Sequence, residues 1–146
     1  MKKKEIKAAL DALKKVRMPK IEDKELRNAL IKNHLFLLGQ NKKYEQDIED
    51  LRTAHLGPYD ETLQEIQELQ NKLQTETDKT KANEIVAEIN SHTEVLEAIN
   101  GFNKAVMDLG NEDVELTLVS GDKFCEEYQN QDYDMNVVEA LYPMFE

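Results

Sequence analysis

Apolar residues recur along this chain at spacings of three and four positions, which is the repeat of an amphipathic helix. Near the N-terminus these apolar residues are Ile6, Leu10, Leu13 and Val16. Their spacing predicts a helix over residues 3–17. Pro19 then breaks the pattern, because proline lacks a backbone N–H and disfavours a helical conformation at the residue before it.

Two longer helical patterns follow, over residues 24–54 and 61–107, on either side of the dipeptide Gly57-Pro58. The second contains a polar stretch at residues 74–81, which is either a weak point within one helix or a true break between two. Amphipathic helices joined by so short a turn pack antiparallel, because each must bury its apolar stripe. We therefore expect an antiparallel helical hairpin, or coiled coil, with residues 24–54 and 61–107 as its arms.

The short turn also predicts which residues of the two arms face each other. It places Leu30 opposite Ile85. It lays the N-terminal helix along the same returning arm, with Leu13 opposite Phe102.

The run Leu35-Phe36-Leu37-Leu38 places apolar side chains all around the first arm. One helix packed beside it covers only part of that circumference. Either the C-terminal segment or another chain must therefore pack there. We expect Leu35, Phe36 and Leu38 to be interaction residues, either in a homo-oligomer or against another protein.

The last part of the chain, residues 112–146, has a different pattern. Residues 113–119 alternate apolar and polar, which predicts a half-buried strand, and Asp134 begins a short helix that ends before Pro143. A strand needs a partner, and the candidates are the segment 18–21 or a strand of another protomer. The expected fold is mainly α, in one elongated domain over residues 1–146. Its N-terminal helix and hairpin carry a small cap of strand plus helix.

Charge is unevenly distributed along the chain, whose net charge is −11. Residues 1–20 hold eight Lys and Arg against two acids, and residues 112–146 hold one Lys against ten acids. We expect the basic first helix to lie against or near acidic surface. Alternatively, the acidic end mimics a nucleic-acid backbone and docks on a basic protein. Direct binding to nucleic acid is disfavoured, because phosphates repel so acidic a chain.

Aromatic residues gather near the C-terminus beside acids and Met. They are Tyr128, Tyr133, Tyr142 and Phe145. This composition is typical of a docking segment that becomes ordered on a partner. It also fits a cap that folds over the end of the hairpin. We treat the four aromatic residues as candidate interaction residues.

No recognisable pattern for catalysis, metal or cofactor binding occurs in the sequence. The histidines have no metal-ligand spacing, Cys125 is the only cysteine, and its acidic neighbours disfavour the reactive thiolate. No apolar run reaches the length of a membrane span. We therefore expect no catalytic residue, no cofactor, no metal, no small-molecule substrate and no membrane partner. The expected location is the cytoplasm of a host cell, or a virion.

The order of these elements resembles a group of small, uncharacterised proteins encoded by tailed bacteriophages and prophages. The residues that carry the resemblance are Ala8 to Leu13, Met18-Pro19-Lys20-Ile21, Glu112 to Val119 and Val137 to Glu146. The resemblance implies a helical-hairpin accessory or virion-assembly protein without known catalysis. It transfers no site residue.

Together these observations predict a non-enzymatic structural or protein-interaction protein of phage or prophage origin. It would act through coiled-coil self-association or by docking on a partner. The alternative is an acidic decoy or inhibitor that binds a basic protein surface through residues 112–146.

Overall fold

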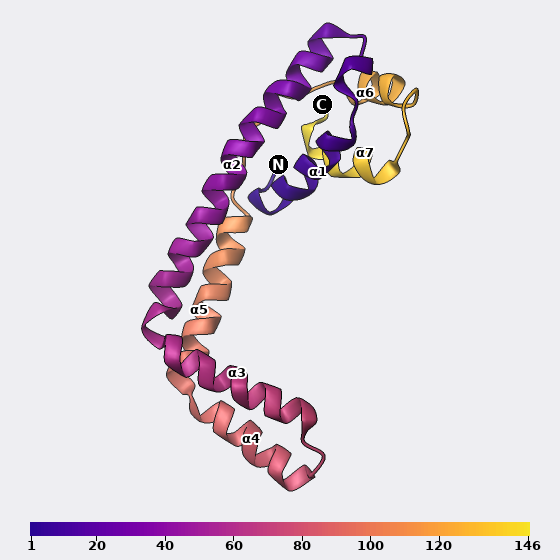
Figure 1. The fold of residues 1–146 in the computed structure, drawn as a ribbon. Coiled ribbons are helices and arrows are strands. Elements are labelled where there is room, and N and C mark those ends of the chain that lie inside the picture. The colour runs from indigo at the N-terminus through magenta and orange to yellow at the C-terminus, as the bar shows by residue number, and fades with distance from the viewer. The chain divides into compact units, whose positions relative to one another are not determined.

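Helices make up most of the chain in the computed structural model, which describes all residues 1–146. The α-helices are α1 (Ile6–Lys15), α2 (Lys24–Leu56), α3 (Asp60–Thr75), α4 (Lys79–Ser91), α5 (Thr93–Gly110), α6 (Gly121–Tyr128) and α7 (Met135–Leu141) (Figure 1). Short 3₁₀ turns occupy Lys3–Glu5, Met18–Lys20, Gly57–Tyr59 and Tyr142–Met144. The predicted mainly α fold is confirmed.

The chain divides into two compact units, where the sequence analysis predicted one domain. Unit 1 consists of Met1–Gln46 and Leu109–Glu146, and unit 2 consists of Asp47–Asp108. The first part of α2 belongs to unit 1 and its last part to unit 2. Each unit is described by itself below.

Unit 1 is built around α1, which packs against α7 from the other end of the sequence. All four apolar residues predicted to share one face of the first helix are buried, although the helix itself ends at Lys15. Buried residues of α2, α6 and α7 complete the same cluster. The C-terminal segment is thus part of the core of unit 1 and not an appendage to it.

The predicted strand at residues 113–119 is wrong, because the segment forms only two isolated bridges. Asp113 pairs antiparallel with Lys2, and Val119 pairs in parallel with Phe145. Between these bridges the backbone of Thr117 is held by the side chain of Asn33. The Asn33 amide accepts a hydrogen bond from Thr117 N–H at 3.1 Å and donates one to Thr117 C=O at 2.8 Å. A side chain therefore takes the place that a neighbouring strand would occupy.

The segment 18–21 is not the strand partner that the sequence suggested. Met18–Lys20 forms a 3₁₀ turn, with Ile21 donating its N–H to Met18 C=O at 3.1 Å. The backbone partners of the 113–119 segment come from the two chain ends instead. Val114 N–H donates to Met1 C=O at 2.8 Å, and Val119 N–H donates to Met144 C=O at 2.9 Å.

In unit 2, α3 and α4 pack against each other as a short hairpin (Figure 1). The polar stretch 74–81 is therefore a true break. Asp78 caps α4, because its carboxylate accepts hydrogen bonds from Thr80 N–H at 2.9 Å and Lys81 N–H at 3.1 Å. A second break falls at His92, between α4 and α5. The predicted arm 61–107 is thus three helices.

The predicted register of the hairpin is wrong for the same reason. Leu30 belongs to unit 1 and Ile85 to α4 in unit 2, and Leu13 and Phe102 likewise belong to different units. The helix that returns beside the end of α2 is α5. A β-carbon placed on Gly101 would lie 3.3 Å from Nδ1 of His55. The sequence pattern did not predict that the chain between these two helices would form the α3–α4 hairpin.

Candidate protein-interaction surface

The part of α2 in unit 1 has one fully buried face. Leu26, Leu30, Asn33 and Leu37 follow one another at spacings of four, three and four, and each is at most 4% exposed. These side chains face the core that α1 and the C-terminal segment share. This face of the helix therefore needs no further partner.

Another face of α2 carries three large apolar side chains in water. Ile31 is 40% exposed, Leu35 is 66% exposed and Leu38 is 46% exposed. Their spacings of four and three place them on one stripe, which we call the α2 outer row. Three neighbouring aliphatic side chains left exposed together are typical of an interaction site.

The sequence analysis selected Leu35 and Leu38 of this row and missed Ile31. The signal for Ile31 was its position four residues before Leu35, which is one turn of helix. Phe36 was also selected and is 43% exposed. It lies about 100° around the helix from Leu35, so it does not belong to the same row.

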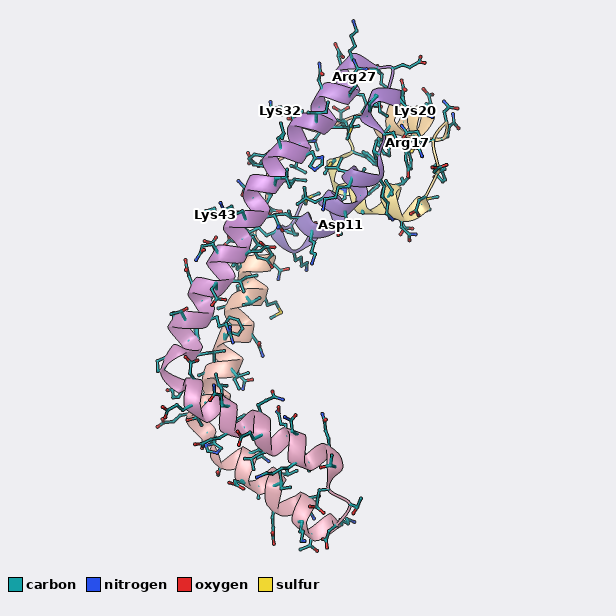
Figure 2. The ribbon with its side chains drawn as sticks, viewed as in Figure 1. Asp11, Arg17, Lys20, Arg27, Lys32 and Lys43 are labelled. Carbon is teal, nitrogen blue, oxygen red and sulfur yellow. The ribbon has the colours of Figure 1, made fainter.

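Basic residues surround the α2 outer row. Lys24 and Lys42 are exposed and lie one heptad from Ile31 and Leu35, so they extend the stripe at its two ends. Figure 2 shows Arg27, Lys32 and Lys43 spaced along the same helix. Between residues 24 and 43, Glu25 is the one acid, against five Lys and Arg.

The C-terminal aromatics divide between core and surface. Phe124 is fully buried and stacks with Tyr128 at a centroid distance of 5.3 Å, and it meets the ring of Phe145 at 5.2 Å. Tyr128 is 1% exposed, so this predicted interaction residue is part of the core and is not available to a partner. Tyr133 and Tyr142 are 48% and 73% exposed.

The acidic C-terminal residues pair with the basic N-terminal ones inside unit 1. Lys15 Nζ lies 3.2 Å from Asp134, and Arg17 lies 2.9 Å from Asp132. Lys2 lies 2.8 Å from Asp113. The expectation that the first helix lies against acidic surface is confirmed.

Most of the chain's excess negative charge therefore lies outside unit 1. Unit 1 holds 14 Lys and Arg against 16 acids, whereas unit 2 holds 5 against 14. In the segment 112–146, which the decoy alternative requires as a free acidic surface, four of the ten carboxylates pair with the chain's own cations: Glu112, Asp113, Asp132 and Asp134. The structure offers no specific observation in favour of that alternative.

A small charged network holds the start of α2. The Glu127 carboxylate accepts hydrogen bonds from Glu22 N–H at 2.9 Å and Asp23 N–H at 3.0 Å. Asp23 accepts one from Leu26 N–H at 2.9 Å, and this bond, followed by the pairing with Lys123, lowers the pKa of the Asp23 carboxyl. The hollow beside these groups is lined in part by Asp23, Glu127 and Lys123, which already form this network. The network therefore has a structural role.

Acid is expected to weaken unit 1. The pKa of Asp134 is lowered, first by the N–H of Asn136 and then by Lys15, and that of Asp113 is lowered by Lys2. A carboxyl whose pKa falls on folding stabilises the fold above its unfolded pKa, about 3.8, and that stabilisation is lost as pH falls through the folded value. Thermal unfolding of unit 1 should therefore occur at lower temperature as pH drops below about 4.

The Asp134→Asn variant is the control for this acid effect. Asparagine retains the helix cap but has no charge to pair with Lys15. Its unfolding temperature should depend less on pH in this range. An equal or steeper dependence would contradict the assignment.

Comparison with known proteins adds no relative to this picture. A scan of protein-family models and searches of curated proteins and solved structures found no match to this chain. No helix has the length and apolar character needed to cross a bilayer. The structure groups no three His, Cys, Asp or Glu side chains in a way that would hold a metal ion.

Proposed function

We propose that this chain is a non-enzymatic structural protein that works by associating with further copies of itself through the α2 outer row, Ile31, Leu35 and Leu38. The observation that supports the proposal is the exposure of these side chains on a helix whose other face is already buried. Covering them in an interface removes apolar surface from water, which stabilises the complex by roughly 25 cal/mol for each Å² of apolar surface buried. A role in the assembly of a phage particle, with a place in the cytoplasm or virion, remains part of the same proposal.

The proposal predicts an oligomer that depends on concentration and on Leu35. Sedimentation velocity of the wild-type chain should show a larger species as concentration rises from about 1 to 500 μM, a range typical of modest interfaces. Leu35→Glu should remain monomeric over this range, because it places a charge at the centre of the apolar row.

Met107→Glu is the matched control for the Leu35 variant. Met107 lies outside the α2 outer row and is 62% exposed, close to the 66% of Leu35. This variant should associate like the wild type. A wild-type chain that stays monomeric at the highest concentration, or equal weakening by both substitutions, would refute the proposed function.

A further inference from the structure

The α2 outer row is the centre of a longer exposed stripe on the same helix. At alternating spacings of four and three, the stripe consists of Lys24, Asn28, Ile31, Leu35, Leu38, Lys42 and Glu45. All seven residues are exposed and all belong to unit 1. The stripe is about 30 Å long, since each residue of an α-helix adds about 1.5 Å.

We propose that the partner of this stripe is the same stripe of a second copy, packed antiparallel about a two-fold axis near Leu35. The inference rests on the proposed function and adds the orientation and the contact points of the association. Two-fold symmetric dimers are the commonest assemblies, and such a dimer requires a surface that is complementary to itself.

The order of charges along the stripe is self-complementary in the antiparallel direction. With Leu35 at the axis, Lys24 lies opposite Glu45 of the partner subunit, which is an attractive pair. Asn28 lies opposite Lys42 of the partner subunit. A parallel arrangement would instead bring each lysine of the stripe against its own copy, and like charges at an interface oppose association.

The apolar centre matches in the same direction. Ile31 lies opposite Leu38 of the partner subunit, and Leu35 lies opposite its own copy. The apolar contacts therefore lie in the middle of the interface and the charged residues at its ends, as in other interfaces between proteins. A nucleic acid or an anionic membrane would meet the same basic flanks, but the acidic excess of unit 2 opposes both.

Gly39 supplies an independent observation on the same surface. It lies inside α2, where glycine is one of the least favourable residues, and no glycine in the chain has a positive φ that would require it. A β-carbon at this position would meet nothing within 4 Å. At Gly101, Gly110 and Gly121, by contrast, a β-carbon would lie 3.0 to 3.3 Å from another residue of the chain.

The missing side chain at Gly39 thus has no explanation within one copy. Gly39 follows Leu35 by one helical turn, so it flanks the outer row. In the antiparallel pair it lies beside the contact between Leu38 and Ile31 of the partner subunit, because Gly39 adjoins Leu38 in the sequence. Glycine at this point lets the second helix approach closely, with an isoleucine filling the space that a side chain would take.

Disulfide cross-linking tests the orientation in the full-length chain. Cysteine is introduced as Lys24→Cys in one sample and as Glu45→Cys in another, both with Cys125→Ser to remove the native thiol. One of the two chains has a short tag, so that mixed dimers differ in size. Oxidation of the mixture should give the mixed dimer as the main cross-linked product, and each variant alone should cross-link weakly.

Substitution of Gly39 tests the close approach. Gly39→Leu should raise the dissociation constant of the oligomer at least tenfold, because the added side chain separates the helices, and Gly39→Ala should have a smaller effect. Neither substitution should unfold the monomer, since the site has open space. Circular dichroism of the diluted variants checks this point.

The outcomes separate this inference from the proposed function. If Leu35→Glu abolishes association but Lys24→Cys cross-links mainly to itself, the antiparallel pairing is overturned and the proposed function stands. Unchanged or tighter association of Gly39→Leu overturns the close approach at that residue. A wild-type chain that does not associate at all refutes both.

Discussion

Phe124→Ala is expected to destabilise unit 1 by about 4 kcal/mol, which is the usual cost of removing a buried phenylalanine from a well-packed core. Phe124 is 0% exposed, and its ring contacts those of Tyr128 and Phe145 at centroid distances of 5.3 and 5.2 Å. Alanine at this position leaves a cavity and removes both ring contacts. Hydrogen exchange of peptides from residues 109–146, measured with increasing urea, reports the loss.

Two comparisons make this result specific. Tyr142→Ala removes an aromatic ring that is 73% exposed, and it should change the stability of unit 1 by less than about 1 kcal/mol. Peptides from α3 and α4 in unit 2 should exchange as in the wild type when Phe124 is replaced. An equal loss of stability in Phe124→Ala and Tyr142→Ala would show that the buried aromatic contacts do not stabilise the core of unit 1.

Asn33→Ala is expected to destabilise unit 1 by about 3 kcal/mol. Asn33 is 2% exposed, and its amide is the hydrogen-bond partner of both the N–H and the C=O of Thr117. Thr117 itself is exposed, so the loss comes from the two part-buried hydrogen bonds, at about 0.5–1.5 kcal/mol each, and from the cavity left at the buried Asn33 side chain. The amide proton of Thr117 should lose its protection from exchange first, which can be followed by NMR.

Asn28→Ala is the matched control on the same helix. Asn28 is exposed, and the same substitution there, measured in solutions dilute enough that both variants are monomeric, should change the stability by less than about 0.5 kcal/mol. If Asn33→Ala is equally mild, water or a shifted backbone replaces the amide, and Asn33 does not hold the 113–119 segment.

The sequence predicted individual helices well and their partners poorly. The buried face of α1 follows from Ile6, Leu10 and Leu13, because helical periodicity is a local property. The pairing of helices depends on where the chain turns. The predicted pairing assumed that the chain reverses at the glycine-proline turn at Gly57. The turn that decides the pairing lies instead at Asp78, which caps α4.

The strand prediction failed because alternation of apolar and polar residues shows which side chains are buried, not what pairs with the backbone. Val114 and Val119 are buried as expected, at 6% and 5% exposure. The partner of the backbone between them is the side chain of Asn33, 84 positions away in the sequence. Nothing in the sequence around Asn33 signals this role.

The candidate surface was predicted in part. Leu35 and Leu38 stand out in the sequence because apolar residues surround the helix there. Which of them remain exposed depends on the side of α2 that the core covers, and this is fixed by contacts with α1 and residues 113–119. Tyr128 shows the same limit. The composition of the segment around it is typical of a docking segment, but its ring is buried.

The two ends of the sequence build one core, and this has a consequence for biosynthesis. Residues 1–46 leave the ribosome with their apolar faces uncovered, because their partners in residues 109–146 are made only after the whole of unit 2. Unit 2 is complete in the meantime, because its residues are continuous in the sequence. Unit 1 therefore cannot complete its core until residues 109–146 have left the ribosome, and until then the nascent chain presents Leu26, Leu30 and Leu37 to chaperones.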